Sequence, residues 1–95
     1  DGVIRARYRD SFERPEYMIP GEAYPFTIEL YPTSNVFSRG HRIRVDISSS
    51  NSPRLDVNPN TGEPLGLGPR TTVADNAVYH DAKRSSHIVL PIIPR

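Results

Sequence analysis

Hydrophobic and polar residues alternate most regularly over residues 41–48. One side of an extended chain would carry aliphatic side chains and the other side charged ones: Ile43, Val45 and Ile47 against Arg42, Arg44 and Asp46. A period of two is typical of an antiparallel sheet with one face on a core and one face in water. The pattern therefore predicts a strand here, with its aliphatic side buried.

Four weaker stretches also predict strands, at residues 3–8, 23–31, 71–79 and 86–93. Within residues 23–31, Phe26, Ile28 and Leu30 share one side of the chain. Loops or turns connect these stretches, over residues 10–21, 32–40, 49–69 and 80–84. No segment has both a start and a stop signal for a helix, so the pattern predicts an all-β protein.

Evenly spaced short strands with clusters of turn residues indicate a β-sandwich or jelly roll. Five predicted strands are fewer than the about eight of a complete jelly roll. We therefore expect residues 1–95 to form one domain that is the C-terminal part of such a sandwich. The chain begins at Asp1 and without Met, so the remaining strands are expected before it, in a longer protein.

Composition narrows the possible partners. Ten prolines and six glycines in 95 residues favour turns over long helices. A formal net charge of +1 gives no attraction toward nucleic acid or a membrane surface, and no apolar run is long enough to cross a bilayer. The lack of cysteine excludes disulfide and thiolate–metal scaffolds, but it leaves open whether the compartment is the cytoplasm or the cell exterior.

The chain has no apparatus for serine-hydrolase chemistry. Such chemistry needs an activated serine, and α/β-hydrolases expose theirs in a G-x-S-x-G turn. That motif does not occur here, and Ser48, Ser49 and Ser50 leave the predicted strand without flanking glycines. We predict no catalytic residue and no cofactor.

The metal-like motif is D-x-N-x-N, formed by Asp56, Asn58 and Asn60. It has the spacing of the first half of an EF-hand calcium loop. However, Thr61 stands where that loop has glycine, and Leu67 stands where it has a bidentate glutamate. We expect these residues to cap turns through nearby backbone N–H groups and not to bind a metal.

The three histidines lie far apart in sequence, so no local zinc-binding spacing exists. We expect His41 to form a hydrogen bond that fixes the turn before its strand. His80 and Asp81 are expected to orient each other at a turn. A site that His41, His80 and His87 form only in space remains an open alternative.

Two surfaces have alternative interpretations. Arg39, Arg42 and Arg44 could form a contact between domains, since arginine suits interfaces, or a solvated outer face. Tyr24 and Tyr31 could bind a sugar, as exposed aromatic residues do in some jelly rolls, or pack at strand ends. The sequence leaves both questions open.

Residues 31–62, YPTSNVFSRGHRIRVDISSSNSPRLDVNPNTG, form the most specific segment. Together with DGVIRARYR at the start and VYHDAKRSSHIVLPIIPR at the end, they resemble the C-terminal β-domain of the X-Pro dipeptidyl-peptidase and cocaine esterase family of serine hydrolases. The resemblance implies a galactose-binding-like jelly roll that follows an α/β-hydrolase domain. It also implies that the catalytic serine, aspartate and histidine belong to that preceding domain.

The resemblance thus implies a non-catalytic domain that packs on the preceding domain and shapes its active-site cleft, with homo-oligomers possible. The family usually reads N-F-P-R-F-D-R-N in the loop where this chain has Ser52, Leu55 and Val57 in place of two phenylalanines and an arginine. A docking contact through this loop would be smaller or built differently, and the parent substrate stays undetermined. The alternative function is a free-standing carbohydrate- or ligand-binding module.

Overall fold

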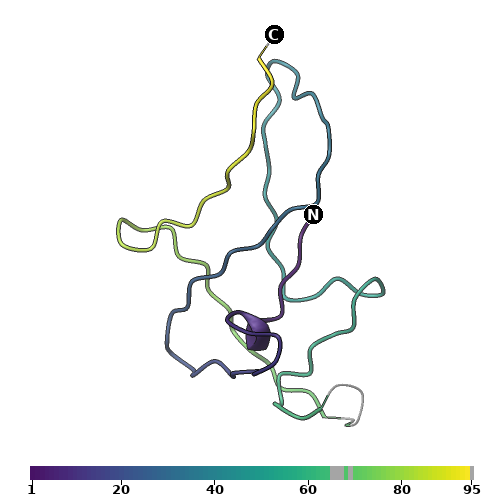
Figure 1. The fold of residues 1–95 in the computed structure, drawn as a ribbon, viewed down its shortest axis with the longest axis vertical. Helices are drawn as coiled ribbons and strands as arrows, with labels where there is room; N and C mark the ends of the chain where they lie inside the picture. Colours follow the sequence, from purple (N-terminus) through teal and green to yellow (C-terminus); the bar gives the residue numbers. More distant parts are fainter. Residues whose placement is uncertain (65–67, 69, 95) are drawn as a thin grey trace. The chain divides into compact units, whose positions relative to one another are not determined.

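The computed structural model of the chain describes residues 1–64, 68 and 70–94 (Figure 1). It divides into two compact units, Asp1–Asp46 and Ile47–Arg95. Over the described residues, the regular elements are one short 3₁₀ helix and one isolated β-bridge. Extended segments and turns make up the other described residues.

The 3₁₀ helix, η1, spans Ala6–Tyr8 and lies inside a predicted strand. Backbone bonds from Tyr8 N to Arg5 O (2.9 Å) and from Arg9 N to Ala6 O (3.3 Å) close the turn. The Arg9 guanidinium also donates to the Ala6 carbonyl, at 3.1 Å. Because local donors occupy this carbonyl, the backbone turns here, and the predicted strand is wrong over residues 6–8.

The start of the chain lies against residues 29–31 of the second predicted strand. The Tyr31 backbone N–H donates to the Asp1 carbonyl at 2.8 Å. Gly2 lies so close to the Glu29 carbonyl that a Cβ at this position would overlap the oxygen. The approach therefore requires glycine at position 2.

Unit Asp1–Asp46 contains two tight turns. One is closed by Glu22 N to Ile19 O (3.1 Å) and the other by His41 N to Ser38 O (3.0 Å). Gly40 occupies the second turn with φ of 85°, a conformation that glycine adopts without strain. The prediction that His41 fixes this turn is confirmed for its backbone N–H.

Unit Ile47–Arg95 contains an antiparallel bridge between His80 and Ser85. The Ser86 N–H also donates to the Tyr79 carbonyl at 3.3 Å. The chain therefore reverses direction between residues 80 and 85, and the predicted turn at residues 80–84 is confirmed.

No described residue is buried. Ile43, Val45 and Ile47, predicted to face a core, are 55%, 52% and 64% exposed. No sheet forms among the described residues to cover this aliphatic side. Whether these side chains enter a core with additional polypeptide stays a prediction, as does the jelly-roll sandwich.

None of the helical structure in the described ranges has the length and apolar character needed to cross a bilayer.

Candidate functional site

The candidate functional feature is the set of large apolar side chains that each unit exposes by itself. Large hydrophobic side chains that occupy predicted strands are two-fifths or more exposed: among them Ile28, Leu30, Ile43, Val45, Ile47, Val73, Ile88, Val89, Leu90 and Ile92. Stable proteins seldom leave so many such residues in water without a partner that covers them. These exposed side chains are therefore suited to an interface or to a core shared with other polypeptide.

Arg9 organises the first unit. Its side chain is only 9% exposed, although it is charged. One guanidinium nitrogen donates to the carbonyls of Ala6 (3.1 Å) and Glu16 (2.8 Å), while Nε lies 3.1 Å from an Asp10 carboxylate oxygen. The guanidinium carbon also lies 4.5 Å from the centre of the Tyr24 ring. These contacts tie both ends of the loop at residues 10–21 to one side chain.

Further contacts support the same loop. The Glu16 N–H donates to the Arg7 carbonyl at 2.8 Å, and the Arg7 guanidinium lies 5.3 Å from the Tyr17 ring centre. The Tyr24 hydroxyl accepts the Ile19 N–H at 3.1 Å. Sequence reasoning missed this cluster, because the prolines indicated only a loop. The available signal was the repeated arginine of R-A-R at positions 5–7 and again at 9, followed by two tyrosines.

The tyrosines considered for sugar binding differ in environment. The Tyr24 ring lies under Arg9, and its hydroxyl also bonds Glu22 at 3.0 Å. Tyr31 is 60% exposed. Tyr24 therefore has a structural role in its own unit, which removes one of the two aromatic rings that a sugar site would use.

The charged side of residues 41–46 is solvated. Arg44 Nε and Nη2 each lie 3.0 Å from Asp46 Oδ2, with the two side chains 84% and 71% exposed. Residues two apart meet on one side of an extended chain, as the alternation predicts. Arg39 and Arg42 are exposed as well. The solvated interpretation therefore describes this surface in the chain by itself.

Asp81 is the best-connected carboxylate of the second unit. It accepts the backbone N–H groups of Lys83 (2.9 Å) and Arg84 (2.8 Å), and Arg84 Nη2 lies 2.6 Å from its other oxygen. The hydrogen bonds from the Arg84 side chain and backbone hold the pKa of Asp81 below its ordinary value. The Arg84 guanidinium also lies 3.8 Å from the Tyr79 ring centre.

The predicted pairing of His80 with Asp81 is therefore wrong, because Arg84 and two backbone N–H groups occupy the carboxylate. His87 contacts the Ser85 carbonyl through Nδ1 at 2.7 Å. Over residues 1–64, 68 and 70–94, no three His, Cys, Asp or Glu side chains gather closely enough to hold a metal ion. Ser48, one of the serines considered for catalysis, donates to the Ser50 carbonyl at 2.7 Å.

The D-x-N-x-N motif forms a turn. Asn58 Oδ1 accepts the Asn60 backbone N–H at 3.2 Å, and Asn58 Nδ2 donates to Asn60 Oδ1 at 2.9 Å. Asn60 has φ of 58°, which asparagine tolerates better than most residues. Turn capping is thus confirmed for Asn58 and stays a prediction for Asp56. Leu67 lies outside the described residues.

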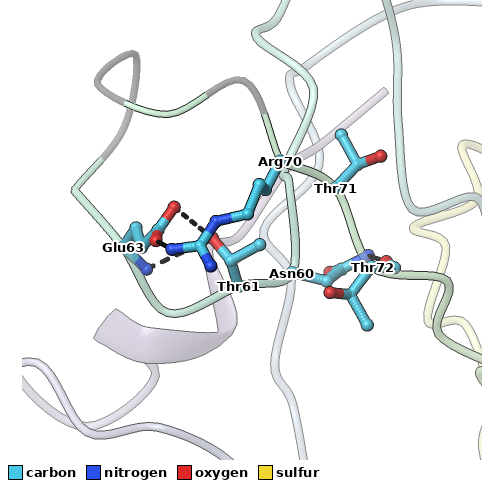
Figure 2. Close-up of a pocket in the computed structure, with 6 residues that line it drawn as sticks. All are labelled: Asn60, Thr61, Glu63, Arg70, Thr71 and Thr72. Atoms are coloured by element: carbon cyan, nitrogen blue, oxygen red, sulfur yellow. Dashed lines mark hydrogen bonds and ion pairs between the residues drawn. The ribbon is translucent and has the colours of Figure 1, made fainter.

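The next segment lines an open hollow of about 400 Å³ (Figure 2). Six side chains surround it: Asn60, Thr61, Glu63, Arg70, Thr71 and Thr72. Figure 2 shows Arg70 reaching across to Glu63, with which it forms an ion pair, while the Thr61 hydroxyl accepts the Glu63 N–H at 3.3 Å. Asn60 Nδ2 donates to the Thr72 carbonyl at 3.1 Å. These polar groups hold the loop closed and bond to one another.

Comparison with known proteins assigns the chain. Residues 1–89 match the family model described as the X-Pro dipeptidyl-peptidase C-terminal non-catalytic domain. All of the chain aligns, at 43% identity, with 17% of the length of cocaine esterase from a Rhodococcus species. Putative serine esterases of Mycobacterium bovis and Mycobacterium tuberculosis are 33% identical over 80% of the chain, which is 10% of their length.

No solved structure matches the chain significantly. The chain spans only 17% and 10% of the lengths of the curated relatives that it matches. The family match and the identity to cocaine esterase confirm the predicted resemblance. The chain belongs to the family of non-catalytic C-terminal domains found in X-Pro dipeptidyl-peptidases and related serine esterases.

Proposed function

We propose that this chain is the C-terminal β-domain of a serine hydrolase, that it packs on a preceding α/β-hydrolase domain, and that it forms one wall of the active-site cleft. The observation that carries the proposal is the exposure of aliphatic side chains that alternate as in a buried sheet, above all Ile43, Val45 and Ile47. The family assignment and the much greater length of the relatives support it.

The proposed fold is an all-β jelly-roll sandwich of which this chain supplies the C-terminal part. The period-two alternation of residues 41–48, the reversal between His80 and Ser85, and the approach of Asp1 to Tyr31 all favour it. Such a sandwich would cover the aliphatic faces and pair the extended backbone.

Burying a large aliphatic side chain contributes about 1.5–3 kcal/mol relative to leaving it in water. Because these side chains are about half exposed, several of them in each unit would together gain stabilisation of the same order as the about 5–15 kcal/mol that a typical domain has in net stability. Additional polypeptide of the same protein is the simplest source of that surface.

The alternative, a free-standing carbohydrate- or ligand-binding module, has less support. Tyr24 is engaged within its own unit, and the polar groups around the hollow at residues 60–72 bond to one another. A bound sugar would have to displace these contacts.

Hydrogen exchange measured by mass spectrometry tests the proposal. Residues 41–48 should exchange slowly in the protein that includes the preceding domain and quickly in the isolated chain.

An activity assay is the second test. The isolated chain should not hydrolyse a chromogenic acyl ester or an X-Pro amide, whereas the longer protein should, with inhibition by a serine-directed reagent. Equal exchange in the two proteins, or inhibitor-sensitive turnover by the isolated chain, would contradict the proposal. A sugar-dependent rise in melting temperature of the isolated chain would favour the binding module.

A further inference from the structure

We infer that residues 10–21 form a preformed docking loop whose Phe12 side chain inserts into the preceding catalytic domain. This inference rests on the proposed function and adds to it the contact element and its anchor residue. The partner is an apolar pocket on the hydrolase domain of the same polypeptide.

The loop is held by contacts that arise within its own unit. Arg9 donates to the Glu16 carbonyl at 2.8 Å, and Glu16 N donates to the Arg7 carbonyl at 2.8 Å. At the near end, the Ser11 hydroxyl accepts the backbone N–H groups of Glu13 (3.2 Å) and Arg14 (3.3 Å). These bonds fix the backbone around Phe12, so docking would order few additional groups.

Phe12 is the most exposed aromatic side chain of the described residues, at 88%. Its ring stacks on Tyr8, with 6.1 Å between the ring centres and 28° between the planes. Tyr17, Met18 and Ile19, further along the same loop, are 59%, 42% and 57% exposed. An aromatic anchor on a rigid backbone with apolar neighbours is typical of an interface hot spot.

This exposure differs in kind from that of the predicted strands. Val73 and Ile92 are 91% and 87% exposed, but they lie in stretches that a neighbouring sheet could cover. The loop contains Pro15 and Pro20, and its backbone is closed by turns, so it cannot join a sheet. Covering Phe12 therefore requires a surface of another kind, such as a pocket on a separate domain.

The size of the loop favours a partner in the same polypeptide over a second copy. Stable contacts between separate proteins bury about 1,200–2,000 Å² in total, more than one loop of this length supplies. A tethered partner is present at an effective concentration near the millimolar range, so a smaller contact suffices. The chain aligns with 17% of the length of cocaine esterase, so most of that relative's length lies outside the matched region.

Photo-crosslinking in the longer protein tests the inference. The probe p-benzoylphenylalanine would replace Phe12, and in a control protein it would replace Arg44, whose side chain is 84% exposed. We expect the probe at position 12 to attach to a peptide of the hydrolase domain within one polypeptide. Attachment only within residues 1–95, attachment to a second copy, or no adduct would overturn the inference.

A second measurement does not depend on the probe. In Phe12→Ala, hydrogen exchange of the crosslinked hydrolase peptide should accelerate, whereas Phe12→Leu should keep most of its protection and Arg44→Ala should leave it unchanged. Unchanged exchange in Phe12→Ala would overturn the docking role. If residues 41–48 are protected in the longer protein but position 12 fails both tests, this inference falls and the proposed function stands.

Discussion

Arg9 and Arg44 differ in exposure and in hydrogen-bond partners, although each lies beside a carboxylate. The Arg9 side chain is 9% exposed and donates to two backbone carbonyls as well as contacting Asp10. Arg44 is 84% exposed and pairs with Asp46. Hydrogen bonds from a charged side chain that is largely covered contribute more than a solvated ion pair does, because water competes with the latter.

Arg9→Ala should therefore destabilise the domain by about 1–3 kcal/mol, the range for hydrogen bonds from a charged group. Arg9→Lys should restore little, because an ammonium group cannot reproduce the planar fork that reaches both carbonyls and lies over Tyr24. Chemical denaturation of the protein with its preceding domain measures both. Arg44→Ala is the matched control, and equal losses at positions 9 and 44 would contradict the assignment.

Asp81 gives the turn at residues 80–85 a pH dependence. Its pKa is lowered, first by the Arg84 side chain, so the folded turn prefers the charged form. The stabilisation is present above the unfolded-state pKa and is lost as pH falls through the folded-state pKa. Because the group is exposed, solvent screens this effect and keeps it small.

Acid titration followed by NMR should thus show the Lys83 and Arg84 amides losing their bonded shifts at strongly acidic pH. In Asp81→Asn the amide oxygen can still accept both N–H groups, but the charge is absent. That variant should show no transition in the same range. A transition that persists in Asp81→Asn would assign the pH dependence to another group.

At the scale of elements, residues 41–48 have the alternating pattern of a strand, but no partner strand pairs with them among the described residues. Their alternation matches a half-buried sheet, and the Arg44–Asp46 pair confirms that residues two apart share a side. Yet Val45 is 52% exposed, and no ladder forms among the described residues. The energetic value of this segment therefore depends on what covers it.

Val45→Ala should cost toward the lower end of about 2–5 kcal/mol in the longer protein, where the proposed sandwich core would cover the segment. In the isolated chain the cost should fall to about 0.5 kcal/mol, as for an exposed position. Arg44→Ala should remain within about 0.5 kcal/mol in both proteins. Denaturant midpoints give the comparison. A loss at Arg44 as large as at Val45 would instead place Arg44 in a buried contact between domains.

At the scale of the whole molecule, the sequence predicted the family and the local turns. The segment at residues 31–62 identified the family, and the family match confirms it. The turns at Gly40 and at residues 80–84 were predicted, because glycine and Asx residues determine turns through their own backbone preferences. The turn at Asn58 and Asn60 follows the same rule.

The sequence by itself determined these features because each depends on residues a few positions apart. Only the tertiary structure decided that Arg9 gathers Glu16 and Tyr24, which lie well beyond its neighbours in the chain. The structure also corrected two local predictions: η1 replaces part of the first predicted strand, and Arg84 replaces His80 as the partner of Asp81. Alternation of side chains specifies which faces are apolar, but burial requires a second surface, and within the described residues of this chain that surface does not form.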